Sequence, residues 1–253
     1  MLNTLYNLYG FNSSYLAICL LCLSLGMTNP ARAEYKKPKN TKNDAPSSQS
    51  TGIAATRGTC SPASDSSEKA NSATLTALAP YGHVGQSAAT NPTFTWYISD
   101  RESYPVEFRL YQLDPAGYQG KGKQVYQTRL SSSAGIMTHS LPAQVSLVPD
   151  RTYIWQVAVI CNPNSPSQSL VVNNRIEIVK NDSTTSQLNS AIDPVTKANT
   201  YANSGLWYDA IAEVAASPND PQTRDATIKL ISQLAATEDN SIEPKNIETH
   251  QQN

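Results

Sequence analysis

Three residues in predicted loops have side chains suited to acid–base chemistry: His83, Asp100 and Glu102. A histidine beside two carboxylates can supply the general base and the general acid that hydrolysis requires. Nucleophilic hydrolysis also needs a positioned serine or cysteine, and the sequence contains no G-x-S-x-G elbow. We therefore expect His83 to be an ordinary loop residue and the two carboxylates to lie in a solvated turn. No residue is predicted to be catalytic.

Tyrosine is abundant, with 13 residues against 3 phenylalanines. Tyr97, Tyr111 and Tyr126 fall on three predicted strands, where they could line one outer face of a sheet. Exposed aromatic rings stack on sugars and anchor protein partners. The alternative is cross-strand pairing of aromatic residues, which stabilises a sheet without binding a ligand. The three tyrosines are thus the candidate face for a ligand or a partner.

Two of the four cysteines, Cys60 and Cys161, lie outside the apolar N-terminal segment. Two cysteines in an exported chain indicate one disulfide, which would attach a polar arm to the strand that carries Cys161. The alternative is two unrelated thiols. Metal binding needs more ligands than these cysteines offer, and the histidines lack ligand spacing. The sequence therefore predicts no metal site and no cofactor.

The N-terminus reads as a secretory signal peptide. A short apolar run at residues 15–27 is followed by Ala31-Arg32-Ala33, a small-residue pattern that places cleavage between Ala33 and Glu34. The run is shorter than the roughly 20 apolar residues that span a bilayer. We expect an exported protein, periplasmic or extracellular, with no stable membrane span after processing.

Charge is nearly balanced, with 19 Lys and Arg against 20 Asp and Glu, and no basic block occurs. Nucleic-acid binding needs a concentrated cationic surface, so a nucleic-acid partner is not expected. Composition divides the chain into a signal peptide at 1–33, a disordered Ser/Pro/Lys-rich arm at 34–73 that contains Cys60, and a disordered tail at 237–253. Between them lie a β domain at 74–180 and a helical appendage at 181–236.

Alternating apolar residues predict seven strands, at 75–80, 93–98, 106–113, 123–130, 135–141, 152–161 and 170–179. The strand at 152–161 is central and carries Tyr153 and Trp155 on one face. The pattern Leu147-x-Pro149-x-x-x-Tyr153 is similar to the tyrosine corner of immunoglobulin-type sandwiches, where the hydroxyl bonds to backbone upstream. We predict an immunoglobulin-like antiparallel β-sandwich, with a small antiparallel barrel as the alternative.

After residue 179 the apolar pattern becomes helical. Asp193-Pro194 and Asp220-Pro221 each combine an N-cap with proline at the first helical position, and Gly205 is a stop signal. Two or three short helices are therefore predicted. Trp207 begins a helix with an apolar face, and we expect its side chain to attach the helices to the sandwich.

A set of short motifs follows in order along the chain: Arg57-Gly58-Thr59-Cys60, Leu75-x-Ala77-Leu78-x-Pro80, Asn91-Pro92-Thr93-Phe94-x-Trp96-Tyr97, Glu107-Phe108-x-Leu110, Tyr153-x-Trp155, Cys161 and Tyr201-Ala202-x-x-Gly205-Leu206-Trp207-Tyr208-Asp209-Ala210. In order and spacing they resemble the cyanobacterial domain of unknown function numbered 928, over roughly residues 57–234. The resemblance implies an exported protein of photosynthetic bacteria with a β-rich domain followed by helices. It implies no activity and no catalytic residue.

Three functions follow as hypotheses. The first is an exported, non-enzymatic protein-interaction or accessory module of the bacterial envelope, with an unidentified envelope protein as partner. The second is carbohydrate binding by an exposed tyrosine face. The third is a hydrolase that uses His83, Asp100 and Glu102. An exposed stripe of tyrosines would favour the second, and convergence of the loop residues in one cleft would favour the third.

Overall fold

The structure is a computed structural model that describes residues 34–39, 60, 73–113, 122–165, 169–180 and 193–237. The predicted signal peptide at 1–33, with its cleavage site before Glu34, lies outside these residues, as do residues 40–59 and 61–72 of the predicted arm and residues 238–253 of the predicted tail. No helix in the described ranges is both long and apolar enough to cross a bilayer.

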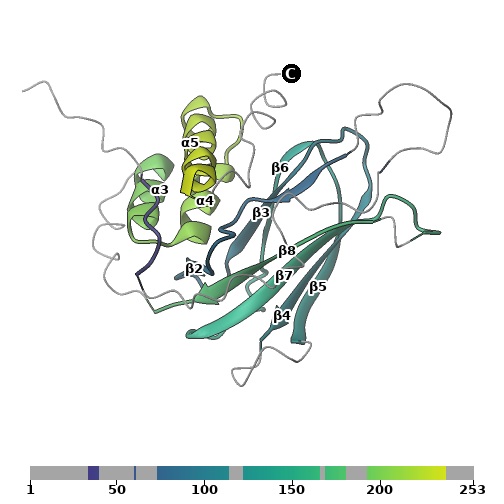
Figure 1. The fold of residues 1–253 in the computed structure, drawn as a ribbon, viewed down its shortest axis with the longest axis horizontal. Coiled ribbons are helices and arrows are strands. Elements are labelled where there is room, and N and C mark those ends of the chain that lie inside the picture. Colours follow the sequence, from purple (N-terminus) through teal and green to yellow (C-terminus); the bar gives the residue numbers. More distant parts are fainter. Residues whose placement is uncertain are drawn as a thin grey trace, which may run out of the picture. The chain divides into compact units, whose positions relative to one another are not determined.

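Within the described residues, eight strands form two sheets, which confirms the predicted mainly β architecture (Figure 1). The strands are β1 Leu75–Ala77, β2 Gly85–Ser87, β3 Thr93–Ile98, β4 Pro105–Gln112, β5 Lys123–Ser131, β6 Gly135–Ser140, β7 Arg151–Val159 and β8 Leu170–Ile178. A three-stranded sheet has the order β1-β3-β6, and a five-stranded sheet has the order β2-β8-β7-β4-β5. All strands except β2 correspond to predicted ones.

Strand β2 corrects the prediction in two ways. Its sequence, Gly-Gln-Ser, has no apolar alternation, so a loop was expected there. It pairs with β8 in parallel, with Gly85 opposite Ile176, so the five-stranded sheet is mixed and not purely antiparallel. Gly85 is required because a Cβ atom there would lie 2.8 Å from the ring of Tyr208. Residues 85–87 therefore form a strand because they pair with the distant strand β8, and the local sequence pattern does not predict such pairing.

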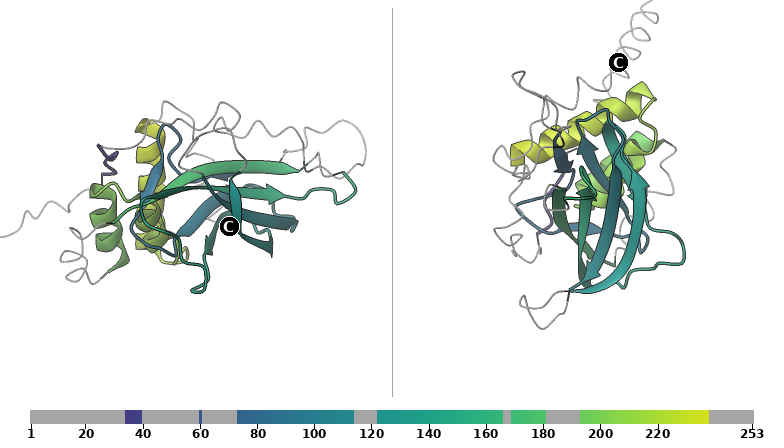
Figure 2. Two further views of the ribbon diagram at one scale, coloured as in Figure 1. Left: turned by 90° about the horizontal axis from the view of Figure 1, so that it is seen from below. Right: turned by 90° about the vertical axis from the view of Figure 1, so that its right-hand side faces the viewer.

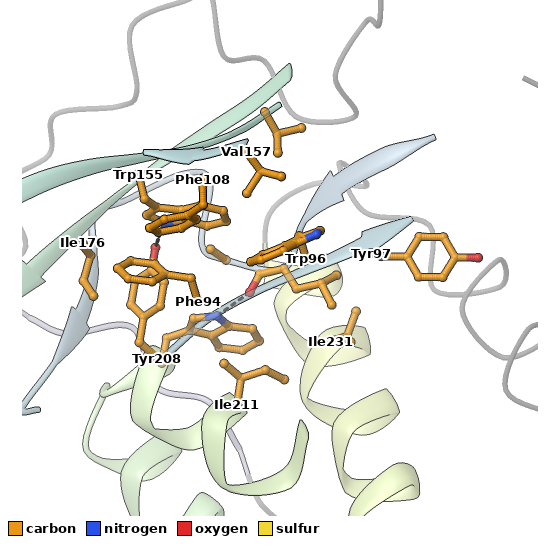
Figure 3. Close-up of a cluster of buried hydrophobic side chains, with 14 of the residues drawn as sticks. Phe94, Trp96, Tyr97, Phe108, Trp155, Val157, Ile176, Tyr208, Ile211 and Ile231 are labelled. Atoms are coloured by element: carbon orange, nitrogen blue, oxygen red, sulfur yellow. Dashed lines mark hydrogen bonds between the residues drawn. The ribbon is translucent and has the colours of Figure 1, made fainter. Parts of the chain in front are cut away.

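The two sheets pack face to face around aromatic side chains (Figures 2 and 3). The ring centroid of Phe94, on β3, lies 5.0 Å from that of Phe108, on β4, and 5.5 Å from that of Trp155, on β7. Trp96 stacks on Phe108 at 6.2 Å. Interleaved side chains from two facing sheets make the arrangement sandwich-like. Its assignment to the immunoglobulin-like class stays a prediction.

The predicted corner before the central strand is present. The backbone N–H of Val148 donates to the hydroxyl of Tyr153 at 2.9 Å. Asp150 lies between them in the left-handed region, with φ of 62°, and its N–H donates to the carbonyl of Ile178 at 2.7 Å. Tyr153 and Trp155 are both fully buried. Tyr153 is thus bonded to the corner, and Trp155 lies in the core.

Three helices follow in the described part of the chain: α3 Pro194–Asn203, α4 Trp207–Ala215 and α5 Pro221–Thr237. The Asp193 carboxylate accepts a hydrogen bond from the Thr196 backbone N–H at 2.8 Å, as expected of an N-cap. Gly205 separates α3 from α4 with φ of +80°, a conformation that glycine adopts without strain. The predicted caps and stop signal therefore define these helices.

Side chains of α4 are part of the sandwich core, and the helices lie at one end of the sheets (Figures 1 and 2). The indole N–H of Trp207 donates to the carbonyl of Leu78 at 2.9 Å. The hydroxyl of Tyr208 accepts from the Trp155 indole N–H and donates to the carbonyl of Arg175, both at 2.8 Å. Trp207 and Tyr208 therefore join α4 to the sandwich, and the helices complete its core.

The predicted arm is attached at two points. A disulfide joins Cys60 to Cys161, just after β7, with Cα atoms 4.9 Å apart, so the predicted pair is present. Residues 34–39 were expected to be disordered, but Tyr35 is only 4% exposed. The physical reason is local: the polar surroundings predicted disorder, whereas one aromatic ring packs against Trp207. The prediction of disorder is therefore wrong for residues 34–39.

Candidate functional site

One surface of the five-stranded sheet faces away from the aromatic core. On β4, Val106, Phe108 and Leu110 are buried, so the residues between them point the opposite way. Strand pairing extends this surface across β5, β7 and β8. We call it the outer face; it consists of Glu107, Arg109, Tyr111, Gln124, Gln127, Arg129, Ile154, Gln156, Ala158, Val171, Asn173 and Arg175.

A row of polar side chains crosses the middle of the outer face. Gln127 pairs with Arg109, Arg109 with Gln156, and Gln156 with Asn173, so four neighbouring strands each contribute one residue. Neighbouring strands lie about 4.8 Å apart, so the row is about 14 Å long. Apolar Ala158 and Val171 lie opposite each other beside it, and Val171 is 40% exposed. The outer face thus combines hydrogen-bonding groups with exposed apolar surface.

Several of these polar groups hold one another in place. The Arg109 guanidinium contacts the Glu107 carboxylate at 2.6 Å. The Gln127 amide donates to the same carboxylate, and the Gln124 amide donates to Gln127 at 3.0 Å. Burial lowers the Arg109 pKa, but a hydrogen bond with Tyr111 and the charge of Glu107 outweigh it, so the pKa is raised. Arg109 therefore stays charged, with Tyr111 beside it.

The three candidate tyrosines do not form one exposed face, and this prediction is corrected. Tyr97 is in the other sheet, 2% exposed, and Figure 3 shows it pointing away from the aromatic cluster. Tyr126 lies opposite Leu110 and therefore faces the core side, whereas Tyr111 follows Leu110 and faces outward. A shift in register between Leu110 and Tyr111 separates them further. Only Tyr111 belongs to the outer face.

Tyr126 pairs with a histidine that faces it from the other sheet. Its ring stacks on His139 of β6 with centroids 5.7 Å apart, and its hydroxyl lies 3.2 Å from the His139 Nε2 atom. Phe108 contacts both rings. Burial lowers the pKa of His139. Tyr126 and His139 thus connect the edge strands β5 and β6 of the two sheets, and both side chains serve packing.

His83 follows β1 and is buried beside the helices, only 3% exposed. Its Nε2 atom lies 2.7 Å from the Tyr35 hydroxyl, and the two rings stack. Burial, together with the positive charge of Lys37, lowers the His83 pKa to about 4. The imidazole is therefore neutral at physiological pH and bonded to Tyr35, where a solvent-borne substrate does not reach it.

Asp100 and Glu102 lie in the turn between β3 and β4, and both accept from the hydroxyl of Tyr104, at 3.1 and 2.9 Å. The backbone N–H of Glu102 also donates to Asp100 at 3.0 Å. Ser99 bonds with Thr74 just before β1, whereas His83 follows the other end of that strand. The structure does not bring His83 together with the two carboxylates. Among the described residues, no group of three His, Cys, Asp or Glu side chains could hold a metal ion.

The sequence reading missed Asp209, an 8% exposed carboxylate in the first turn of α4. One oxygen accepts from the Ser87 hydroxyl at 3.1 Å and the Ala89 N–H at 3.2 Å. The other accepts from the Ala88 N–H at 2.9 Å. Burial raises the Asp209 pKa to about 6, against the opposing effect of these hydrogen bonds. Asp209 holds the end of β2 to α4, and no local sequence signal predicts that pairing.

A family model described as Domain of Unknown Function (DUF928) matches residues 52–244. The matched range includes every described strand and helix, whereas residues 34–39 precede it. No curated protein matches the chain. The comparisons therefore supply a family without an activity, and any function must be argued from the geometry.

Proposed function

The chain belongs to the DUF928 family, a domain of unknown function, and we propose that it is an exported, non-enzymatic protein-interaction module whose partner binds the outer face. The observation that carries the proposal is the composition of that face. Tyrosine and arginine are the residue types that most often anchor protein interfaces, and here Tyr111 and Arg109 lie side by side.

The rigidity of the outer face favours recognition. Arg109, Glu107 and Gln127 are bonded to one another on neighbouring strands before a partner arrives. Binding then costs little side-chain entropy, because these rotamers are already fixed. Exposed Val171 adds apolar surface, so the face has the mixed character of a non-obligate interface.

Export is supported by the bond between Cys60 and Cys161. Disulfides persist in oxidising compartments and are rare in the cytosol. We therefore place the protein in the bacterial periplasm or outside the cell, with an envelope protein as its partner. The N-terminal apolar run followed by Ala31-Arg32-Ala33 supports the same location.

A non-enzymatic role is supported by the contacts of His83 and Asp209, a base and an acid whose pKa values burial shifts strongly. His83 is bonded to Tyr35, and Asp209 accepts three hydrogen bonds from residues 87–89. A general base must reach a substrate proton through a hydrogen bond. Both groups instead spend their hydrogen-bonding capacity on joining parts of the fold.

Site-specific photo-cross-linking in intact host cells tests the proposal. A photoreactive amino acid replaces exposed Gln127 on the outer face, and a matched control replaces exposed Lys229 on α5. We expect a discrete cross-linked protein of defined mass from position 127 and none from position 229. Equal capture at both positions, or capture at neither, would contradict a partner on the outer face.

Carbohydrate binding is the second candidate, favoured by one observation: Tyr111 lies beside Arg109, which belongs to a row of amide and guanidinium groups. Aromatic rings stack on sugars, and amides bond to their hydroxyl groups. Titration of the protein with envelope glycans tests this idea, with Tyr111→Ala as the variant and Tyr126→Ala as the control. Binding that only Tyr111→Ala removes would support it, and absence of binding would exclude it for the glycans tested.

A further inference from the structure

Residues 34–39 form a short segment without regular secondary structure, held by side chains and backbone from four other parts of the chain. In Figure 1 this segment, coloured purple, runs alongside α3. Its contacts come from His83 in the loop between β1 and β2, from α3, from α4 and from α5. It precedes the range that the family model matches.

The ring of Tyr35 fits between two aromatic side chains. It stacks on His83 with centroids 5.8 Å apart and meets the edge of Trp207 at 5.0 Å. Its hydroxyl lies 2.7 Å from the His83 Nε2 atom. A tyrosine that is buried on its faces and bonded at its tip is the kind of anchor that dominates recognition of short peptides.

The backbone of the segment is recognised as well. The N–H of Tyr35 donates to the Gln233 side-chain oxygen at 3.1 Å, and the N–H of Lys36 donates to the Ala202 carbonyl at 3.0 Å. Two consecutive N–H groups are thus paired, so the site fixes the backbone of the segment as well as the Tyr35 ring. These contacts depend on a tyrosine and on its backbone, and not on the chain that supplies them.

Gly205 makes room for the following residues. A Cβ atom at this position would lie 2.7 Å from the Pro38 ring and 3.0 Å from the Lys36 carbonyl oxygen. The glycine that ends α3 therefore also allows the segment to approach the helices. An aromatic slot, two acceptors for backbone N–H groups (the Gln233 side chain and the Ala202 carbonyl) and the close approach allowed by Gly205 together form a built site for a Tyr-x-x-Pro segment.

We propose that this site is a peptide-recognition site, filled here by the chain's own residues 34–39 and able to take the same segment from a second copy of the chain. Residues 40–59 separate the segment from Cys60, and a chain of that length extends to at most about 70 Å. Cleavage before Glu34 would make the segment a free chain end. A free end on a long connection enters a neighbouring molecule without threading, as in domain swapping.

The first test uses the full mature chain with Tyr35→Ala, which keeps the site and removes the anchor of its own segment. A synthetic peptide of residues 34–39 is titrated into it, with tryptophan fluorescence as the readout because Trp207 lines the site. We expect saturable one-to-one binding, and binding to the wild-type chain at least about tenfold weaker because the tethered segment competes at high effective concentration. The same peptide with alanine in place of tyrosine should not bind.

Tyr35→Phe provides a second host in case Tyr35→Ala does not fold. It keeps the ring and loses only the hydroxyl bonded to His83, so the peptide should bind it about fivefold more tightly than it binds the wild-type chain. Peptide binding to neither host, or equal binding to wild type and variants, would overturn the recognition site. Gln233→Ala in the host, which removes an acceptor of the segment, should weaken binding.

The second test addresses the second copy. Full-length mature wild-type chain, labelled with a fluorophore, is mixed with unlabelled Tyr35→Ala chain, and complex formation is followed by size exclusion with light scattering. We expect a mixed dimer that grows with concentration and that excess peptide dissociates. Peptide binding without any mixed dimer would overturn the second copy as the occupant.

Discussion

The buried carboxylate of Asp209 makes folding stability depend on pH in a predictable direction. Burial raises its pKa to about 6 in the folded protein, whereas the ordinary value is 3.8. A group that binds its proton more tightly when folded stabilises the fold at low pH. This stabilisation is fully present below about pH 4 and is lost as the pH rises through about 6.

The size of the effect follows from the shift. Each pKa unit corresponds to 1.36 kcal/mol, so a difference of about two units is worth about 3 kcal/mol between acidic and alkaline conditions. The neighbouring Tyr201 does not interfere, because burial and the charge of Asp209 raise its pKa from 10.0. Titration of Asp209 should therefore account for a measurable slope between pH 4 and pH 7.

Asp209→Asn removes this titration. An asparagine has one acceptor oxygen, so it can serve Ser87 and Ala89 or else Ala88, but not all three. The lost pairing costs the variant about 1–3 kcal/mol at low pH, where Asp209 of the wild type is protonated. The wild type then loses about 3 kcal/mol of stability as the pH rises through about 6, and the variant does not, so the difference between them should shrink to about zero or change sign above about pH 7.

The measurement is urea unfolding from pH 4 to pH 8, followed by tryptophan fluorescence, because Trp96, Trp155 and Trp207 are all buried. The free energy of unfolding of the variant is compared with that of the wild type at each pH. Asp225→Asn, which makes the same change at an exposed carboxylate, is the control. A difference between wild type and Asp209→Asn that stays constant with pH would refute the raised pKa.

Four further outcomes follow from the same contacts. His83 has a folded-state pKa of about 4 against an ordinary 6.5, so it stabilises the fold above about pH 6.5, and this stabilisation is lost as the pH falls towards 4. His83→Gln should remove this loss of stability at low pH, which urea unfolding of the variant at each pH measures. Cys161→Ser should lower the free energy of unfolding by about 4–5 kcal/mol, because the disulfide closes a loop with a sequence separation of 101. Thermal unfolding of the variant, and of the wild type with and without reductant, measures this loss. A wild-type melting temperature that reductant leaves unchanged would contradict the prediction. Gly205→Ala should cost about 1–2 kcal/mol because φ is +80°, and protease cleavage of residues 34–39 should accelerate; unchanged cleavage would count against the contact with Pro38. Tyr208→Phe should cost about 2–3 kcal/mol, since the Trp155 N–H and the Arg175 carbonyl both lose a partner; a cost below 0.5 kcal/mol would show that water replaces the hydroxyl.

The elements that the sequence predicted correctly are those whose signals are local. Strands β3 to β8 have apolar alternation or a corner motif, helices α3 and α5 have Asp-Pro starts, and Gly205 stops α3. Strand β2 has none of these signals, and it exists because it pairs with β8 and because Asp209 holds the residues that follow it. Its strand conformation is thus a consequence of tertiary contacts.

The candidate site was harder to predict because faces depend on register. Alternation within β4 and β5 was read correctly, but the sequence does not contain the alignment of one strand with the next. With Tyr126 opposite Leu110, and a register shift before Tyr111, two tyrosines expected on one face lie on opposite faces. The polar row from Gln127 to Asn173 also depends on the register between strands, so no pattern along the chain predicts it.

His83 and Asp209 have the chemistry of a catalytic base and acid, but their contacts explain why the helices and the sandwich form one unit. His83 binds a segment nearly 50 residues earlier, with a separation of 48, and Asp209 binds residues more than 100 positions away, with separations of 120 to 122. Contacts of such long range are costly to form in chain entropy, so each must be offset by burial and hydrogen bonding. A charged group that is buried for this purpose has a perturbed pKa for structural reasons. The outer face carries its charges on the surface, where a partner can reach them, and this contrast is the reason to look for binding there and for stability at His83 and Asp209.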